Sequence, residues 1–326
     1  MTTSVLLYVD FNASSGLGHV SRAEAFFEAI STDQNKVYIS SEKDTDRLKP
    51  NFNFLKNVTW IDFQEAKQMD FDIAYLDTYS NATINEFKEI SAIKKILLID
   101  SNFNDEIPNW ANLVIVLEQA NVRNSNHKAL LVYGLTLIKN RIVRVKIVRQ
   151  RVYNFDPEYL VGIVNFGGSI QSLDYLLKLK NTFAINNKIK YKVFCESELI
   201  STLQLEFSSL SNVTINAIGA NYYEQLIMSD FVITAAGTSF LEALYVNIPI
   251  VLFNLYDSAN SIFSNFRFEQ NVLFSGEKEE FSMFSQPEAI VKMEKMNLES
   301  VNVLMNTTCT FLEPRDIFIS LTNIFN

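Results

Sequence analysis

Two clusters of polar and small residues have the composition of a catalytic or ligand-binding site. The first follows a hydrophobic run near the amino terminus and comprises Asp10, Gly16, Gly18, His19 and Arg22. Imidazole takes up and releases a proton near neutral pH, so His19, one of only 2 histidines in the chain, is a candidate general base. The alternative is a structural role, in which His19 only caps the helix that follows.

The second cluster also follows a hydrophobic run and comprises Gly237, Thr238, Ser239 and Glu242. Glycine lets the backbone approach a ligand closely, and the free N–H groups at the start of a helix favour phosphate. Glu242 lies one helical turn further on, where it can accept hydrogen bonds from ribose hydroxyls. These are attributes of a diphosphate site, although Ser239 and Glu242 also fit a helix capping box.

The spacing of the glycines disfavours a dinucleotide-binding site. After Gly16 and Gly18, the third glycine of the G-x-G-x-x-G pattern would fall at Ser21. A metal site is also disfavoured, because the D-x-D pair of Asp70 and Asp72 precedes a predicted strand and two carboxylates are few for Mg²⁺. We therefore expect neither a metal ion nor another cofactor.

The elements that position the first cluster are predicted to be parallel strands. Three hydrophobic runs of the first half end at Asp10, Asp77 and Asp100, and helical spacing from Ala82 to Ile93 separates two of them. The carboxyl ends of the strands of one parallel sheet lie at one edge, where ligands bind. We expect the three aspartates to approach the same crevice.

The same alternation returns in the second half of the chain. A predicted strand ending at Asn165 leads into the turn Gly167-Gly168-Ser169 and a predicted helix from Ile170 to Phe183. Another strand, from Phe231 to Thr234, leads into the second cluster. A length of 326 residues is sufficient for two domains. The sequence thus predicts an α/β protein of two doubly wound domains, 1–150 and 151–326, facing one another across a cleft.

Composition narrows the range of partners. The chain is 48% hydrophobic and has a formal net charge of −9, which argues against general affinity for nucleic acid. Lys139 to Arg151 nevertheless holds 6 of the 28 basic residues. We expect a solvated segment at the domain junction, with attraction to a phosphate-rich substrate, an acidic partner or anionic lipid as the alternative. No role in the site is assigned to this segment.

The cysteines and the amino terminus favour a cytoplasmic protein. Cys195 and Cys309 are far apart and match no metal-ligand or redox spacing, which is typical of a reduced protein. The first apolar run stops at Asp10 and has no basic segment before it, so no signal peptide is predicted. No apolar run is long enough to predict a transmembrane helix.

Taken in order, these motifs resemble the UDP-sugar hydrolase family of the pseudaminic acid pathway. The D-x-S-x-x-x-G-x-G-H-x-x-R pattern of that family is matched at Asp10, Gly16, Gly18, His19 and Arg22, with Asn12 in place of the serine. Shorter similarities lie at Asp77, Tyr79, Glu86, Gly167, Gly168, Ser169 and Glu242-Ala243-Leu244. The resemblance implies a GT-B-like fold, which is shared with glycosyltransferases, with two Rossmann-like domains.

The resemblance also implies a reaction and a set of site residues. His19 would activate water at the anomeric carbon of a UDP-linked deoxy amino sugar, with Asp10 as the second catalytic residue. The residues implied in sugar binding are Gly18, Arg22, Asp77, Tyr79 and Asn260. Those implied in nucleotide binding are Gly167, Gly168, Ser169, Ile218, Gly237, Thr238, Ser239 and Glu242. The implied partner is a nucleotide sugar, UDP-linked rather than CMP-linked, used in nonulosonic acid or surface-glycan synthesis.

Two departures from the family pattern leave the sugar and its acceptor open. Tyr8 stands where the family has an arginine, and Asn260-Ser261 stands where it has an Asn-Gln pair. The alternative is a GT-B glycosyltransferase in which His19 deprotonates an acceptor hydroxyl rather than water. A third possibility is a non-catalytic sensor of nucleotide sugars, for which replacing His19 would change nothing.

Overall fold

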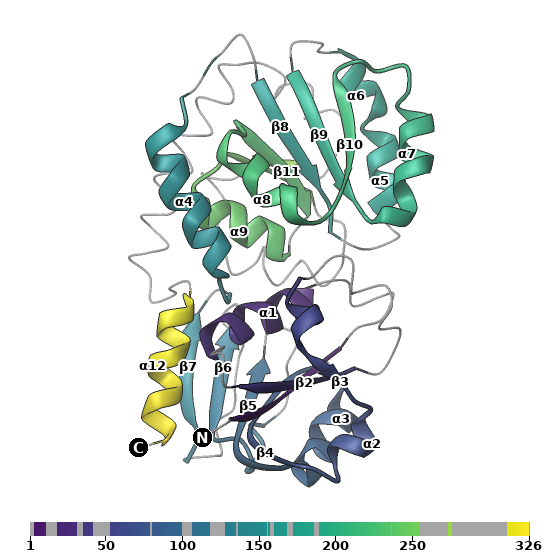
Figure 1. The fold of residues 1–326 in the computed structure, drawn as a ribbon. Helices are drawn as coiled ribbons and strands as arrows, with labels where there is room; N and C mark the ends of the chain where they lie inside the picture. Colours follow the sequence, from purple (N-terminus) through teal and green to yellow (C-terminus); the bar gives the residue numbers. More distant parts are fainter. Residues whose placement is uncertain are drawn as a thin grey trace. The chain divides into compact units, whose positions relative to one another are not determined.

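The computed structural model describes residues 3–10, 18–30, 35–41, 53–78, 80–99, 106–117, 128–134, 136–154, 156, 160–167, 172–185, 189–235, 237–253, 273–275 and 312–325. The chain divides into two compact units, which Figure 1 shows in sequence colours. Unit 1 comprises Met1–Asn140 and Cys309–Asn326, and unit 2 comprises Arg141–Thr308. The boundary between the two domains was predicted at residue 150. The chain instead enters unit 2 at Arg141, and its final segment returns to unit 1.

Unit 1 is built on a parallel sheet of 7 strands in the order β3-β2-β1-β4-β5-β6-β7. Its strands are β1 Ser4–Val9, β2 Lys36–Ser40, β3 Thr59–Trp60, β4 Asp70–Asp77, β5 Ser91–Ile99, β6 Leu113–Leu117 and β7 Leu130–Gly134. In the register of the two central strands, Val9 lies opposite Asp77. Because β1 and β4 run in the same direction, Asp10 and Asp77 come to the same edge of the sheet.

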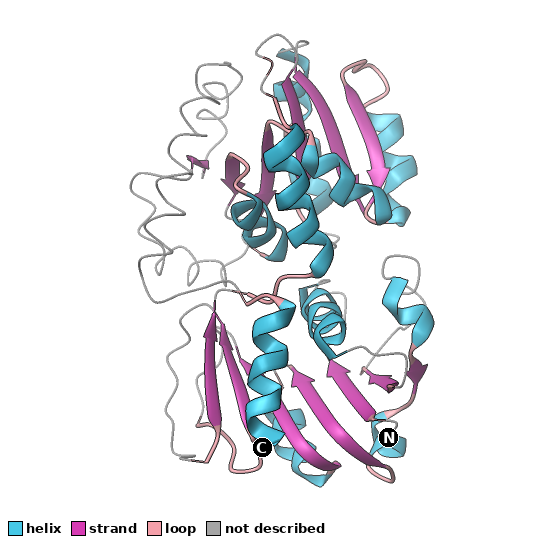
Figure 2. Cartoon of the chain, turned by 60° about the vertical axis from the view of Figure 1, so that its left-hand side comes forward, coloured by secondary structure: helices cyan, strands magenta, loops and turns pink. Residues whose placement is uncertain are grey.

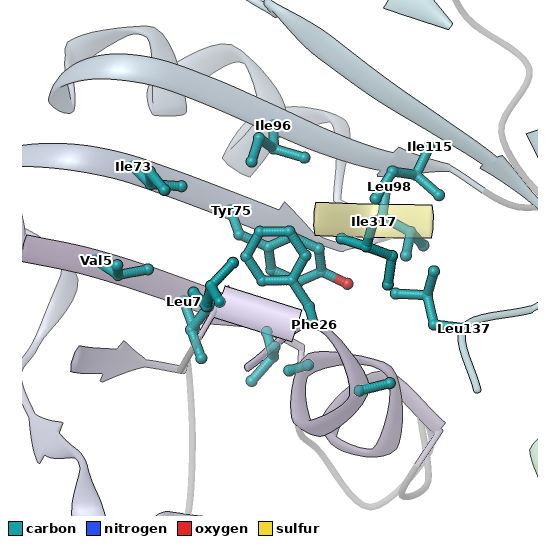
Figure 3. Packing of buried hydrophobic residues seen from close by; sticks show 14 of the residues in the cluster. Val5, Leu7, Phe26, Ile73, Tyr75, Ile96, Leu98, Ile115, Leu137 and Ile317 are labelled. Atoms are coloured by element: carbon teal, nitrogen blue, oxygen red, sulfur yellow. The ribbon is translucent and has the colours of Figure 1, made fainter. Parts of the chain in front are cut away.

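Helices cover both faces of this sheet. They are α1 Gly18–Ile30, α2 Phe63–Ala66, α3 Asn81–Glu86 and α12 Pro314–Phe325, with short 3-10 helices η2 Asn53–Asn57 and η3 Phe87–Glu89. Ser80 caps α3 by accepting a hydrogen bond of 3.2 Å from the N–H of Thr83. On the face covered by α1 and α12, the ring of Phe26 stacks on Tyr75 with 4.4 Å between centroids (Figure 3).

Strand β1 illustrates why both faces are apolar. Val5, Leu7 and Val9 belong to the core on the side of α1 and α12, whereas Leu6 and Tyr8 belong to the core on the opposite side. Successive side chains of a strand point to opposite faces, so a continuous apolar run is what a doubly covered parallel strand requires. Tyr8 therefore lies within a buried core and stands where the resembled family has an arginine.

Unit 2 has a parallel sheet of 6 strands in the order β10-β9-β8-β11-β12-β13. Its strands are β8 Leu160–Asn165, β9 Ile189–Cys195, β10 Val213–Ala217, β11 Phe231–Ala235, β12 Ile250–Phe253 and β13 Leu273–Ser275. Its helices are α4 Asn140–Val152, α5 Ser172–Lys178, α6 Lys180–Ile185, α7 Ile200–Glu206, α8 Ala220–Ile227 and α9 Thr238–Val246, with the 3-10 helix η4 Ser197–Leu199. In each unit helices follow most of the strands along the chain, and Figure 2 shows helices packed beside each sheet. Both halves thus confirm the predicted doubly wound α/β class.

Several predicted boundaries differ from those observed. The helix predicted from Ala82 to Ile93 ends in η3, because Ile93 belongs to β5. The helix predicted from Ile170 to Phe183 is interrupted at Leu179, which separates α5 from α6. The last helix, α12, begins at Pro314, a helix position where proline's missing N–H costs no hydrogen bond.

Candidate functional site

Both sheets reverse their strand order at one point. In unit 1 the chain moves outward from β1 to β3 on one side and continues from β4 on the other, so the reversal lies between β1 and β4. In unit 2 the equivalent point lies between β8 and β11. In doubly wound sheets, ligands bind outside the carboxyl ends of the strands at such a point. The two clusters of the sequence analysis follow these strands.

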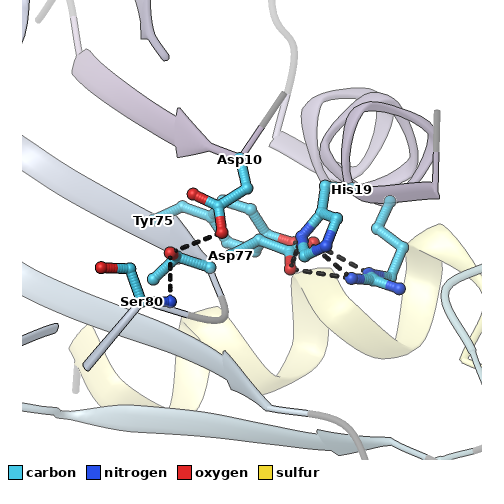
Figure 4. Close-up of polar contacts among 7 residues, drawn as sticks. Asp10, His19, Tyr75, Asp77 and Ser80 are labelled. Carbon is cyan, nitrogen blue, oxygen red and sulfur yellow. Dashed lines mark hydrogen bonds and ion pairs between the residues drawn. The ribbon is translucent and has the colours of Figure 1, made fainter. Parts of the chain in front are cut away.

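In unit 1 this point holds a buried histidine–aspartate pair. His19 is the second residue of α1, and its Nδ1 lies 2.6 Å from Oδ1 of Asp77, the last residue of β4 (Figure 4). Each of the two residues is only 1% exposed. The structure thus brings together two residues that are 58 positions apart in the sequence.

Arg22 completes the network from the next turn of α1. Its Nε donates to Oδ2 of Asp77 at 2.8 Å and its Nη2 donates to Oδ1 at 2.9 Å. This two-pronged geometry matches a guanidinium to a carboxylate and strengthens both hydrogen bonds. Arg22 is close to His19 because residues 3 positions apart share one face of a helix.

The electrostatic balance keeps Asp77 ionised. Burial by itself raises the pKa of Asp77, but the charges of Arg22 and His19 and their hydrogen bonds lower that pKa well below its ordinary value. An ionised carboxylate only accepts hydrogen bonds, so Nδ1 of His19 carries a hydrogen and donates a hydrogen bond to Asp77. With a hydrogen on Nδ1, the other ring nitrogen, Nε2, is the atom of His19 that can bind or release a proton.

Tyr75 adds a third donor to the same carboxylate. Its hydroxyl donates to Oδ2 of Asp77 across 3.4 Å. Burial, followed by the negative charge of Asp77, raises the pKa of Tyr75 well above its ordinary value. Tyr75 therefore stays protonated and acts as a donor in this network.

Asp10 is held beside this network by a residue that the sequence analysis missed. The N–H of Asp10 donates to the carbonyl of Asp77 at 3.0 Å. Oδ2 of Asp10 accepts a hydrogen bond of 2.7 Å from the hydroxyl of Thr78, which in turn accepts from the N–H of Ser80 at 2.9 Å. The signal available in the sequence was the position of Thr78, directly after a strand that ends in a carboxylate.

Lys139 is a second residue that the sequence analysis did not assign to the site. Its Nζ donates to Oγ of Ser21 at 2.7 Å and lies 3.8 Å from Oε2 of Glu24. All three residues are buried, and Ser21 and Glu24 belong to the same helix as His19. A buried lysine is unusual unless it is paired. Lys139, Ser21 and Glu24 thus form a second buried polar group on α1, besides His19 and Arg22.

In unit 2 the corresponding point is organised by an amide side chain. The side chain of Asn165, the last residue of β8, accepts a hydrogen bond of 2.9 Å from the N–H of Gly167. It also donates to Oγ of Ser239 at 3.0 Å. One buried carboxamide therefore joins the turn after β8 to the first turn of α9, where the sequence analysis placed the nucleotide.

The glycines of these turns leave room beside the backbone. Gly167 has a φ of +80°, a conformation that favours glycine, and a Cβ added there would meet nothing within 4 Å. A Cβ at Gly237, the residue before α9, would likewise meet nothing within 4 Å. Open space beside a helix start is what close approach of a phosphate needs.

Glu242 and Tyr222 are two buried polar residues beside the turns at Gly167 and Gly237. Glu242 is 3% exposed, one turn into α9. Burial raises the pKa of Tyr222, and the negative charge of Glu242 adds to the rise. Four polar side chains from β8, α8 and α9 thus lie together behind the two turns.

Ile218 is oriented differently from the other predicted nucleotide-binding residues. Its N–H donates to the carbonyl of Cys195 at 2.9 Å, which continues the pairing of β9 with β10. Its backbone N–H is therefore used by the sheet.

The thiol of Cys195 is not a candidate nucleophile. Burial raises the pKa of Cys195 to about 11, so this thiol is an inert core group.

Some predicted site residues lie outside the described residues. They are Tyr79, Gly168, Ser169 and Asn260, together with Gly16 and Asp100. Gly18 is described and opens α1. Thr238 and Ser239 are the first two residues of α9, and both are half-buried.

The aspartate pair that precedes β4 in the sequence analysis lies at the start of that strand. Oδ2 of Asp72 accepts hydrogen bonds from the N–H and the hydroxyl of Ser4, at 2.7 and 3.1 Å. Asp72 thus links β1 to β4 at the opposite end from Asp77.

Among the described residues, no cluster of three or more histidine, cysteine, aspartate or glutamate side chains could hold a metal ion. None of the described helices combines the length and apolar character needed to cross a membrane.

Comparison with known sequences gives one distant relative. No family model matches the chain. An uncharacterized protein of Methanocaldococcus jannaschii is 24% identical over 279 residues, which cover 76% of this chain and 55% of that protein. The chain therefore spans about half the length of the curated relative that it matches.

Comparison with solved structures identifies the fold. The spinosyn rhamnosyltransferase SpnG in complex with thymidine diphosphate is similar at a TM-score of 0.64, with 8% identity over 98% of this chain and 100% of that one. MurG of Acinetobacter baumannii has a TM-score of 0.58, with 12% identity over 99% of both chains. Anabaena HepE in complex with UDP and glucose gives the same values. With its two parallel α/β units, the chain has a GT-B-like fold.

Proposed function

We propose that this chain is a glycosyltransferase that moves a sugar from a nucleoside diphosphate, UDP in the first instance, to an acceptor hydroxyl. The observation that carries the proposal is the buried His19–Asp77 pair at the strand-order reversal of unit 1. Asp77 fixes the proton on Nδ1 and leaves Nε2 as the base. The full-length match to GT-B structures and the open turns of unit 2 support the same proposal.

In the proposed reaction, Nε2 of His19 accepts the proton of the acceptor hydroxyl. The acceptor oxygen forms a bond to the anomeric carbon, the bond from that carbon to the phosphate oxygen breaks, and the nucleoside diphosphate leaves with the electron pair. Asp77 stabilises the imidazolium that forms, and Arg22 holds Asp77 in place. General-base catalysis of this kind contributes about 10²- to 10⁴-fold to a rate.

Unit 2 is proposed to bind the nucleotide. The N–H groups at the start of α9 and in the turn at Gly167 would bind the diphosphate, since both are backbone donors beside open space. The carboxylate of Glu242 would accept hydrogen bonds from the ribose hydroxyls. Asn165 would act as a positioning residue, because its carboxamide joins the two turns by hydrogen bonds.

Hydrolysis of a UDP-linked deoxy amino sugar is the second candidate. The observation in its favour is the amino-terminal motif of Asp10, His19 and Arg22, which resembles that of UDP-sugar hydrolases. The same pair of His19 and Asp77 could activate water in place of an acceptor hydroxyl. Transfer is the first candidate because the solved structures of similar fold named above include a rhamnosyltransferase.

The test is a turnover assay with matched histidine variants. The purified protein is incubated with a panel of UDP-, dTDP- and CMP-sugars, with and without a panel of hydroxyl acceptors, and nucleotide release is followed by chromatography. We expect acceptor-dependent release that falls by about 10²- to 10⁴-fold in His19→Asn and is unchanged in His127→Asn. Nucleotide affinity, measured by calorimetry, is expected to be the same in all three proteins.

The other outcomes separate the alternatives. Equal amounts of nucleotide and free sugar without any acceptor would assign hydrolysis. Tight nucleotide-sugar binding with no turnover that depends on His19 would assign a sensor. If none of the nucleotide sugars binds, the proposed function is wrong.

A further inference from the structure

Helix α4 carries a continuous exposed stripe of apolar and basic residues. The stripe consists of Arg144, Ile147, Val148, Arg151 and Val152, which are spaced so that they share one face of the helix. Ile147, Val148 and Val152 are 44%, 39% and 51% exposed. Isolated exposed apolar residues are ordinary, but three on one helical face form a patch.

Other residues of α4 fix the helix to the rest of unit 2. Buried Arg149 donates from Nη1 to the carbonyls of Leu226, Ile227 and Ser229 at 3.2, 2.9 and 2.6 Å, at the end of α8. Arg141 lies over the ring of Tyr223, and Lys146 over the ring of Tyr245 in α9. In Figure 1, α4 flanks α8 and α9. These contacts hold the helix in one rotation, so the stripe faces solvent.

This arrangement corrects the expectation that the basic segment is solvated. Arg149 is buried, and Arg141 and Lys146 cover tyrosine rings. Only Arg144 and Arg151 of the five basic residues in α4 are exposed, and neither forms an ion pair with any residue that the structure describes. The charge of these two arginines is thus available to a partner.

The charge of α4 is opposite to that of the whole chain. Residues Asn140–Val152 contain five basic and no acidic residues, whereas the formal net charge of the chain is −9. A helix that is basic within an acidic protein attracts an anionic surface locally. The exposed apolar side chains between the two arginines add a component that a phosphate or nucleotide would not use.

We propose that the α4 stripe binds the surface of an anionic lipid bilayer. Apolar side chains flanked by arginines are the composition of helices that lie in the headgroup region, where the arginines bind anionic headgroups and the aliphatic groups enter the acyl boundary. A protein partner is less well matched, because the centres of protein interfaces are enriched in tryptophan and tyrosine, which this stripe lacks. The proposal does not depend on the proposed function.

Vesicle sedimentation with the full chain tests the proposal. The probes are vesicles of phosphatidylcholine alone and of phosphatidylcholine with phosphatidylglycerol. We expect binding to the anionic vesicles only, weakened by salt. Each arginine near an anionic surface contributes about fivefold, so the variant with both Arg144→Gln and Arg151→Gln is expected to bind about 25-fold more weakly. A variant with Ile147→Ser and Val152→Ser is expected to lose binding as well.

Matched controls separate the stripe from net charge and from exposure in general. The double variant Lys88→Gln with Arg315→Gln removes two exposed charges elsewhere, and Leu205→Ser removes a side chain that belongs to a residue 75% exposed in α7. Both controls are expected to bind vesicles as the unmodified protein does. Circular dichroism confirms that each variant is folded.

Three results would overturn the proposal. They are binding to neutral vesicles as strong as to anionic ones, loss of binding in the controls equal to that in the α4 variants, and absence of binding to either vesicle. In the last case, sedimentation equilibrium shows whether the stripe joins two copies of the chain. Self-association that Ile147→Ser with Val152→Ser abolishes would assign the stripe to that contact.

Discussion

The two units place different chemistry at the same position of the same topology. In each, the strand order reverses between the first and the fourth strand of the unit, and a helix begins after each of the two strands. Unit 1 fills this position with buried charged side chains, His19, Arg22 and Asp77, that pair with one another. Unit 2 fills it with glycines, the hydroxyls of Ser239 and Tyr222, the amide of Asn165 and a single buried carboxylate, Glu242.

The two units show that the fold determines where a site lies but not which chemistry it performs. Parallel sheets bring strand ends and helix starts together, and the residues of the connecting loops then decide the chemistry. Paired buried charges orient an acid or base, and the removal of one partner destabilises the fold. Backbone donors beside glycine bind an anion without a fixed charge. The comparison therefore predicts that changes in unit 1 affect turnover and stability, whereas changes in unit 2 affect affinity.

The largest effect is expected from Asp77→Asn. The variant leaves Arg22 buried without its carboxylate, and breaking a buried ion pair on one side costs about 3–5 kcal/mol of the free energy of unfolding. Urea denaturation followed by circular dichroism measures this loss. Asp70→Asn, an exposed residue at the other end of β4, is the matched control and is expected to have the stability of the unmodified protein. Equal stability of the two variants would contradict the role of the buried network.

A smaller effect, confined to affinity, is expected from Asn165→Ala in unit 2. The variant removes the partners of the Gly167 N–H and the Ser239 hydroxyl, and an unsatisfied group of this kind costs about 1–3 kcal/mol. We expect a higher KM for the nucleotide sugar and a weaker nucleotide affinity, with kcat little changed. Steady-state kinetics and calorimetry are the measurements, and the exposed Asn181→Ala is the control. A fall in kcat at unchanged KM would contradict the assignment of this residue to nucleotide binding.

The smallest effect is expected in the pH dependence of stability. Because the pKa of Asp77 is lowered in the folded protein, its ion pair stabilises the fold above the ordinary carboxyl pKa of about 3.9, and this contribution is lost as the pH falls. The free energy of unfolding should thus decline on acidification more steeply in the unmodified protein than in Asp77→Asn. Urea titrations at a series of pH values compare the two slopes. Parallel declines would show that Asp77 has the same pKa in the folded and unfolded chains.

The sequence predicted where the site lies better than which of its residues contact one another. The strand ends at Asp10 and Asp77 and the helix start at His19 follow from hydrophobic runs that stop at polar residues. The choice of Asp77 rather than Asp10 as the partner of His19 depends on the pairing of β1 with β4 and on the rotation of α1, which no local pattern contains. Arg22 was predicted in the motif, but its two hydrogen bonds to Asp77 depend on the same rotation.

Residues that act through neighbours distant in sequence were the ones missed. Asn165 appears in the sequence only as the last residue of a strand, and its contact with Ser239 spans 74 positions. Lys139 was grouped with a basic run, although its partner Ser21 lies 118 positions earlier. The burial of Arg149 likewise depends on α8, which follows it by more than 70 positions. Contacts of this range are set by tertiary packing, which overrides local patterns.

The return of the chain to unit 1 determines the order in which the protein can be completed during synthesis. Ile317 and Leu321 of α12 pack into the core that contains Phe26, and Leu312 exchanges backbone hydrogen bonds with Thr136 and Ile138. These residues leave the ribosome after all of unit 2. The amino-terminal unit is therefore finished last, and until then its first helix has an uncovered apolar flank that a chaperone can bind.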